Sequence, residues 1–167
     1  DMTKLVKDAI TLQKAGQPTV RIKGDLPGQA VLADVDGTMI SQALTNLIKN
    51  AGEATETYQQ KHADGDYRPE IRISMALDAD HMQIRIADNG IGLPEDRARL
   101  FEPYVTTRDS GTGLGLPIVK KIIEEHGGVL TLTDAAVFDG QEHAGACAII
   151  ELPALSAGTE ATKIPAQ

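Results

Sequence analysis

The sequence has a single cysteine, so no disulfide can form within the chain. Cys147 lies in an apolar run, residues 146–150, that predicts a strand in which the thiol is a small core group. No apolar run approaches the length needed to cross a bilayer, and no signal peptide begins at Asp1. We therefore expect a cytosolic domain, and one taken from a longer protein, because the chain starts inside a helical pattern.

Basic residues are also in short supply. The 16 Lys and Arg side chains face 24 Asp and Glu, which gives a formal net charge of -8. This balance argues against nucleic acid as a partner, because phosphate backbones require clustered positive charge. A small polyphosphate would have to be held locally, by backbone N–H groups and a metal ion, and not by the field of the whole protein.

The four histidines do not form a pattern that would indicate metal binding or nucleophilic catalysis. His62, His81 and His143 fall in expected turns or loops without metal-ligand spacing, and His126 ends an expected helix. The sequence contains no convincing Ser/His/Asp or Cys/His arrangement for nucleophilic catalysis.

The chain of 167 residues has the length of one domain, and its patterning alternates between helices and strands. Helical periodicity covers residues 2–14, 38–61, 117–126 and, briefly, 95–101. Strand-like alternation covers 19–23, with the charges of an edge strand, and 31–33, 70–77, 82–87, 129–133 and 146–152. We predict an α/β domain of the α+β kind over residues 1–153 and a disordered tail over 154–167.

Two glycine clusters flank a long loop in the middle of the chain. The strand 82–87 leads into Asp88-Asn89-Gly90-Ile91-Gly92. A carboxylate at a strand end can accept a hydrogen bond from an exocyclic amino group, which selects adenine over guanine. Gly90 and Gly92 remove side chains where a flat base must approach the backbone. This cluster therefore predicts the base-binding half of a nucleotide pocket.

The second cluster predicts the phosphate-binding half. It consists of Gly111, Thr112, Gly113, Leu114, Gly115 and Leu116, directly before the helix 117–126. Its glycines let backbone N–H groups converge at the positive end of a helix, where anions bind. The segment between the clusters contains prolines and little periodicity, which indicates a mobile lid.

Each cluster alone has a plainer interpretation. Asn89-Gly90 by itself favours a hairpin turn, but a helical pattern follows it where a returning strand would be needed. The second cluster could belong to a Rossmann phosphate loop, with Asp134 downstream. The third glycine is missing, however, and the preceding residues do not form a strand, so the Rossmann interpretation is disfavoured.

The helix 38–61 adds three polar residues on one stripe: Asn46, Asn50 and Glu53. Asparagine is a poor helix former, and an amide oxygen is a reasonable ligand for Mg²⁺. From this helix alone, a metal ligand and a pair of solvating amides are equally supported. The glycine clusters in the same chain favour the metal ligand.

Four motifs occur in one order and together resemble the catalytic ATP-binding domain of sensor histidine kinases. They are the asparagine box 46–51, the first glycine box 88–92, the phenylalanine box 100–104 and the second glycine box 111–116. The resemblance covers nearly all of residues 1–153, and the segments 50–54 and 101–107 are most similar to nitrogen-regulation kinases of the NtrY type. It implies the Bergerat fold: a two-layer sandwich of a mixed, mostly antiparallel sheet with helices on one face and an ATP lid.

The resemblance also implies roles for individual residues. Asn50 would hold Mg²⁺, Asn46 would act on the phosphate side as the catalytic candidate, and Asp88 would bind the adenine amino group. The lid would contribute Thr106, Thr107 and Arg108, the last of which would meet the terminal phosphate. Relatives often carry a basic residue where this chain has Glu53, so Arg108, with Lys49 as the second choice, would supply the positive charge.

No histidine here has the phosphoacceptor setting of these kinases, so the resemblance implies the catalytic domain alone. It would bind ATP and Mg²⁺, release ADP, and phosphorylate a histidine on the dimerisation and phosphotransfer domain of the same parent. The phosphorelay would continue to an NtrX-like response regulator, and the parent would be membrane-anchored. The alternatives are a related ATPase or anti-sigma-like serine kinase, and a nucleotide-binding interaction module; Asn46, standing where hydrolytic relatives carry glutamate, argues against the ATPase.

Overall fold

The computed structural model describes residues 1–62, 65–95, 100–101, 115–138 and 143–155. Within them the helices are α1 (Met2–Gly16), α2 (Gly37–Lys61) and α3 (Gly115–Glu125). The strands are β1 (Arg21–Asp25), β2 (Glu70–Asp78), β3 (His81–Asp88), β4 (Val129–Asp134) and β5 (Ala146–Pro153). None of the described helices is long and apolar enough to cross a membrane.

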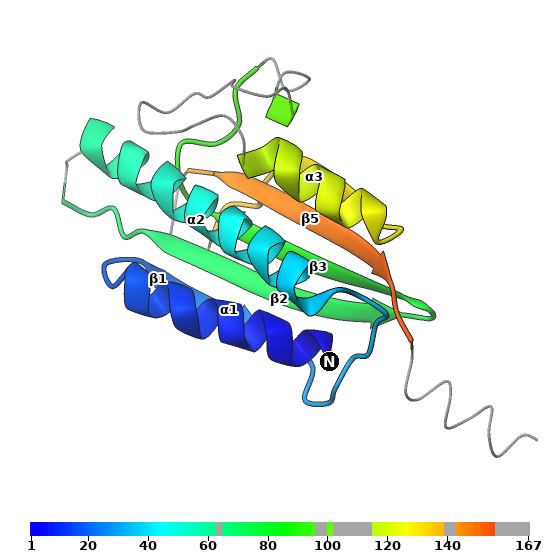
Figure 1. Ribbon diagram of the computed structural model, residues 1–167. Coiled ribbons are helices and arrows are strands. Elements are labelled where there is room, and N and C mark those ends of the chain that lie inside the picture. The colour runs from blue at the N-terminus through cyan, green and yellow to red at the C-terminus, as the bar shows by residue number, and fades with distance from the viewer. Residues whose placement is uncertain (63–64, 96–99, 102–114, 139–142, 156–167) are drawn as a thin grey trace, which may run out of the picture.

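The strands form one mixed sheet in the order β1-β2-β3-β5-β4 (Figure 1). β1 runs parallel to β2, and the other neighbouring pairs are antiparallel. The hairpin of β2 and β3 turns at Ala79, whose φ is +52°, and pairs Ile71 with Asp88 at its open end. The hairpin and the edge position of β1 agree with the sequence pattern; the parallel pairing of β1 was not predicted.

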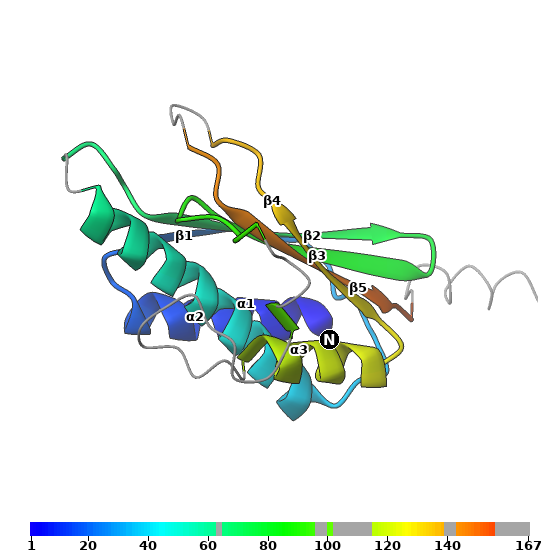
Figure 2. The same cartoon turned by 90° about the horizontal axis from the view of Figure 1, so that it is seen from above.

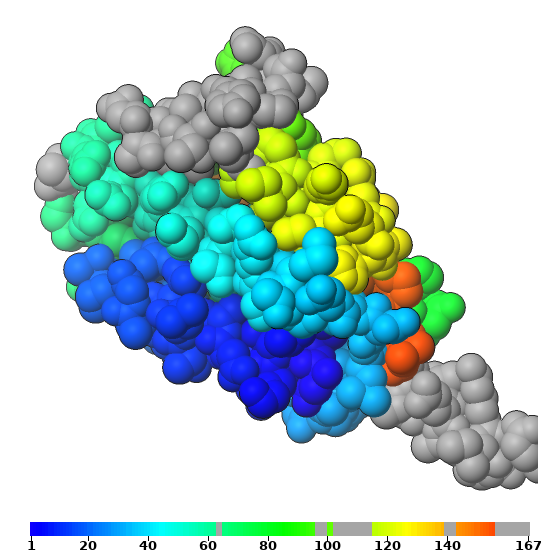
Figure 3. Space-filling model, in the orientation of Figure 1, coloured from blue at the N-terminus to red at the C-terminus, as the bar shows by residue number. Residues whose placement is uncertain are grey.

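All three helices cover one face of the sheet (Figure 2), where they lie side by side in the order α1, α2, α3 (Figure 3). The strands turn every second side chain toward them, which buries Ile71, Ile73, Met75, Met82, Ile84, Ile86, Ile150 and Leu152. α2 is the central helix, and its buried face contains every residue predicted for it: Ile40, Ala43, Leu44, Leu47, Ile48, Ala51 and Ala54. The predicted two-layer α+β sandwich is therefore confirmed.

The cap at the start of α2 is joined to the residue that follows α3, and this contact fixes the two helices relative to each other. Asp36 begins α2 by accepting hydrogen bonds from the N–H groups of Thr38 and Met39, at 3.0 and 3.2 Å. Its own N–H donates to Nε2 of His126, at 3.0 Å, and that residue directly follows α3. The chain turns away from α3 at Gly127, which has a φ of +77°.

One predicted strand is reduced to a single bridge. Within the described ranges, the segment 31–33 forms one β-bridge, from Leu32 to Leu155. The N–H of Met2 donates to the carbonyl of Val31 at 2.7 Å, so this segment is divided between α1 and the extension of β5. Leu155 thus contacts the folded domain, although we predicted that the disordered tail begins at residue 154. Residues 156–167 and most of the predicted helix 95–101 lie outside the described residues.

Candidate functional site

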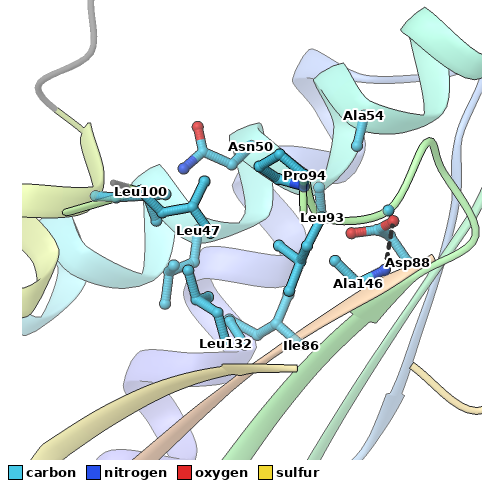
Figure 4. Close-up of a pocket in the computed structure, with 14 residues that line it drawn as sticks. Leu47, Asn50, Ala54, Ile86, Asp88, Leu93, Pro94, Leu100, Leu132 and Ala146 are labelled. Atoms are coloured by element: carbon cyan, nitrogen blue, oxygen red, sulfur yellow. Dashed lines mark hydrogen bonds between the residues drawn. The ribbon is translucent and has the colours of Figure 1, made fainter. Parts of the chain in front are cut away.

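A pocket opens between α2, the start of α3 and the ends of β3 and β5, with about 550 Å³ of empty space, part of it open to solvent (Figure 4). Its walls are mostly apolar and come from every layer of the fold, including Leu47, Ala51, Ile86, Leu132 and Ala148. Asp88 and Asn50 add polar groups to this lining. Apolar walls with a few oriented polar groups are typical of a pocket for a small organic ligand.

Asp88 ends β3 and is only 5% exposed. Its Oδ1 accepts hydrogen bonds from the N–H of Gly90 at 2.8 Å and from the N–H of Ala146 at 3.3 Å. Figure 4 shows the second of these bonds. The turn after β3 and the first residue of β5 therefore hold the carboxylate from two directions. A carboxylate fixed in this way can read a hydrogen-bond donor on a ligand without first being ordered.

Gly145 lies directly against Asp88, and the sequence analysis did not assign it to the site. A Cβ atom at residue 145 would overlap the carbonyl oxygen and Oδ1 of Asp88. The available signal was a glycine directly before a predicted strand, which often marks a close approach of backbone to another group.

The two glycines of the first cluster have different surroundings. Gly92 lines the pocket with a φ of +80°, a conformation that side chains rarely allow. Gly90 is not among the lining residues; a Cβ there would overlap the backbone of Ala54 and Thr55 in α2. The N–H of Ile91 donates to the carbonyl of Ala54 at 3.2 Å. The missing side chain at Gly90 thus lets the turn pack against α2. The sequence analysis predicted a different reason for this glycine, namely that a flat base approaches the backbone there.

Asn50 faces the beginning of α3. A Cβ at Gly115 would be 3.8 Å from Nδ2 and 3.9 Å from Oδ1 of Asn50, in ordinary contact. Asn46 and Glu53 lie half-buried on the same helix but are not among the lining residues of the pocket. The structure therefore brings one of the three predicted polar residues of α2 to the pocket.

Part of the predicted phosphate side belongs to the described chain. Gly115 and Leu116 open α3, and Leu116 lines the pocket, so the first N–H groups of this helix lie near Asn50. The other predicted residues of the lid and the second glycine box lie outside the described residues: Thr106, Thr107, Arg108, Gly111, Thr112, Gly113 and Leu114.

No cluster of three or more His, Cys, Asp or Glu side chains suited to a metal ion occurs in the described ranges. Asn50 offers a single amide oxygen. Mg²⁺ in nucleotide sites usually combines one or two protein oxygens with water and substrate phosphates, and the donor set around Asn50 fits that pattern.

Asn89 is a second residue that the sequence analysis did not assign to the site. It is 1% exposed, and its side chain bridges two segments: Oδ1 accepts from the N–H of Glu70 at 3.0 Å, and Nδ2 donates to the carbonyl of Arg68 at 2.9 Å. Its N–H donates to the carbonyl of Glu70 at 3.3 Å. Asn89 thus ties the turn after β3 to the start of β2; it does not sit in a hairpin turn.

Tyr67 closes this network. Its hydroxyl donates to the carbonyl oxygen of Asn89 at 3.0 Å and to Oδ1 at 3.1 Å. Burial raises the pKa of Tyr67, and the nearby Asp88 carboxylate and Tyr58 raise it further, so the hydroxyl remains a donor at neutral pH.

Comparison with known proteins agrees with this geometry. Residues 35–156 match the family model described as histidine kinase-, DNA gyrase B- and HSP90-like ATPase. The nitrogen regulation protein NtrY of Azorhizobium caulinodans is 46% identical over 136 residues, which is 81% of this chain and 17% of that protein. The chain thus spans about a sixth of this relative's length.

Solved structures share the fold. The mycobacterial sensor histidine kinase MprB superimposes with a TM-score of 0.76 at 22% identity, covering 93% of this chain and 96% of that one. The nucleotide-free catalytic domain of histidine kinase ThkA gives a TM-score of 0.70 at 27% identity, with 90% of both chains covered. The resemblance to sensor histidine kinase catalytic domains is confirmed, and the chain belongs to the histidine kinase-, DNA gyrase B- and HSP90-like ATPase family.

Proposed function

We propose that this chain binds ATP with Mg²⁺ and supplies its γ-phosphoryl group to a histidine on another domain of its parent protein. Support comes from the family, which uses ATP, and from the similarity to sensor histidine kinases. The observation that carries the proposal is the placement of Asp88 and Asn50 in one apolar pocket, on different sides of it (Figure 4).

In this proposal the adenine ring lies between the apolar walls and donates its exocyclic amino group to the Asp88 carboxylate. The phosphates extend toward the start of α3, where N–H groups without partners inside the helix favour anions. Asn50 holds Mg²⁺ there through its amide oxygen, and Asn46, Thr106, Thr107 and Arg108 act on the phosphate side, as do residues 111–116. Gly90 and Gly92 shape the turn beside the base.

The transfer itself forms a bond between a histidine nitrogen of the partner domain and the γ-phosphorus. The bond from the γ-phosphorus to the bridging oxygen breaks, and ADP leaves with that oxygen. This chain contributes positioning and charge stabilisation and takes no covalent part in the step. The similarity to NtrY suggests nitrogen regulation as the pathway and an NtrX-like response regulator as the next acceptor. We place the domain in the cytoplasm and expect the parent to be membrane-anchored, as NtrY-type kinases imply.

The test combines binding with transfer. Asp88→Asn should weaken ATP binding by more than about tenfold in calorimetry while circular dichroism shows an unchanged fold. Asn50→Ala should remove the dependence of ATP affinity on Mg²⁺. Incubating the domain with the phosphoacceptor fragment of its parent and γ-labelled ATP should give acid-labile phosphohistidine. ATP binding that survives Asp88→Asn unchanged would remove Asp88 from the site, and absence of transfer by an ATP-bound domain would refute the kinase proposal.

A further inference from the structure

Three aromatic rings gather beside the turn that follows Asp88, in a chain with only three tyrosines, two phenylalanines and no tryptophan. Tyr58 of α2 and the ring of His143 are stacked, with centroids 4.4 Å apart and planes 20° apart. Tyr67 packs against Tyr58 at a tilt of 53°, with centroids 4.6 Å apart. We name Tyr58, Tyr67 and His143 the Tyr58 cluster.

A fourth ring completes the stack around Tyr58. His62 lies 4.1 Å from Tyr58, centroid to centroid, with planes only 15° apart. One face of a phenol ring has no room for two imidazoles at such distances, so His62 and His143 occupy opposite faces. Tyr58 is therefore held between two rings, and His143 in turn has a fixed orientation.

The polar ends of the Tyr58 cluster hold two consecutive carbonyl groups. The hydroxyl of Tyr67 donates to the carbonyl oxygen of Asn89 at 3.0 Å, and Nε2 of His143 contacts the carbonyl oxygen of Gly90. A carbonyl offers only acceptor sites, so the proton on His143 in this contact belongs to Nε2.

The N–H groups of the same turn are also occupied. Those of Asn89 and Ile91 donate to the carbonyl oxygens of Glu70 and Ala54, at 3.3 and 3.2 Å. The N–H of Gly90 donates to Oδ1 of Asp88 at 2.8 Å. The peptide group that joins Gly90 to Ile91 is thus fixed at its oxygen by His143, while the one before it orients the Asp88 carboxylate through its N–H.

We propose that the Tyr58 cluster positions Asp88 for adenine recognition, with His143 and Tyr67 as positioning residues that act through the carbonyl groups of Gly90 and Asn89. This inference rests on the proposed function, in which Asp88 binds the exocyclic amino group of adenine. The cluster itself does not touch the base; it restricts the turn that carries the Asp88 contacts. A rigid turn lowers the entropy lost when the carboxylate binds its donor.

The test compares two nucleotides that differ only in the group read by Asp88. Purine riboside 5′-triphosphate lacks the 6-amino group of ATP but keeps the ring and the phosphates. The ratio of its dissociation constant to that of ATP, measured by calorimetry in the presence of Mg²⁺, reports the amino-group contact. Wild-type protein should prefer ATP.

His143→Ala and Tyr67→Phe should each weaken ATP binding by roughly three- to tenfold and leave binding of the analogue nearly unchanged, so that the preference for ATP falls by the same factor. His143→Gln, whose side-chain amide can still donate to Gly90, should keep most of the preference. His81→Ala is the matched control, because His81 is an exposed residue at the start of β3 and its side chain contacts Asp80.

Equal weakening of both nucleotides would overturn the inference, because a merely structural role lowers both affinities alike. Tyr67→Phe removes a single oxygen and keeps the ring, so it carries the test even where His143→Ala does not fold. A wild-type protein that binds ATP and the analogue equally would instead refute base reading by Asp88, and with it this part of the proposed function. If the wild-type protein prefers ATP and both variants keep that preference, the positioning role of the Tyr58 cluster is refuted, whereas base reading by Asp88 is not.

Discussion

Gly145 and Asp88 approach so closely that no side chain fits between them. A Cβ atom at residue 145 would overlap both the carbonyl oxygen and Oδ1 of Asp88. The close approach lets the N–H of Ala146 reach the carboxylate at 3.3 Å. The chain entering β5 is thereby part of the wall that orients Asp88.

Gly145→Ala should therefore disturb the pocket from behind. The added methyl group must push β5 or the Asp88 carboxylate aside, and such overpacking typically costs about 1–3 kcal/mol of unfolding free energy. We expect a lower midpoint in urea denaturation together with weaker ATP binding. Gly28→Ala is the matched control, since nothing lies within 4 Å of a Cβ at that position. Equal behaviour of the two variants would show that the backbone yields at residue 145 without consequence.

Most elements of this fold could be predicted from the sequence, because the spacing of apolar residues within one short segment shows which face of that helix or strand is buried. Alternation over residues 82–87 located β3, and the apolar stripe of residues 38–61 located α2 with its complete buried face. Which strands pair with each other could not be predicted in the same way. The parallel pairing of β1 with β2 depends on residues about fifty positions apart, and local periodicity contains no signal for it.

The same contrast holds for the pocket. Motif spacing pointed to Asp88, Asn50, Gly92 and Leu116, which the structure brings to one cavity. The groups that hold Asp88 in place escaped prediction, because His143 and Tyr67 belong to loops that meet only in the folded chain. Each looks like an ordinary loop residue until its contact with the turn after β3 is known.

His126 joins α2 to α3, and its replacement should loosen both. Its Nδ1 lies 2.7 Å from the carbonyl oxygen of Ile122, and its Nε2 accepts from the N–H of Asp36 at 3.0 Å. These contacts assign the proton of the neutral ring to Nδ1. His126→Ala leaves a backbone donor and acceptor without this partner, so the free energy of unfolding should fall by about 1–2 kcal/mol.

Denaturant unfolding of His126→Ala against His81→Ala measures this contribution, because the His81 side chain is exposed at the start of β3. Hydrogen exchange at the N–H of Asp36 provides a local readout, since that group loses its acceptor. Unchanged stability and unchanged exchange would mean that water replaces the imidazole at no cost.

Cys147 should react slowly while the protein is folded. The thiol lies on β5 and the residue is only 4% exposed. Burial raises the pKa of Cys147; Arg85 opposes this shift and Asp88 adds to it. Only the thiolate is nucleophilic, and each unit of pKa increase lowers its fraction about tenfold at a given pH. Alkylation by iodoacetamide at pH 8 should therefore be at least roughly tenfold slower in native protein than in urea-unfolded protein.

The same shift predicts the direction of a pH effect on stability. Because the pKa of the folded state is raised, the thiol contributes fully to stability below the ordinary thiol pKa of about 8.5 and loses that contribution as pH rises through the folded-state value. Cys147→Ala removes the titrating group, so the fall in unfolding free energy between about pH 8 and pH 10 should be smaller in this variant than in the wild type. Rapid alkylation of the native protein, at the rate of the unfolded chain, would contradict the burial of this thiol.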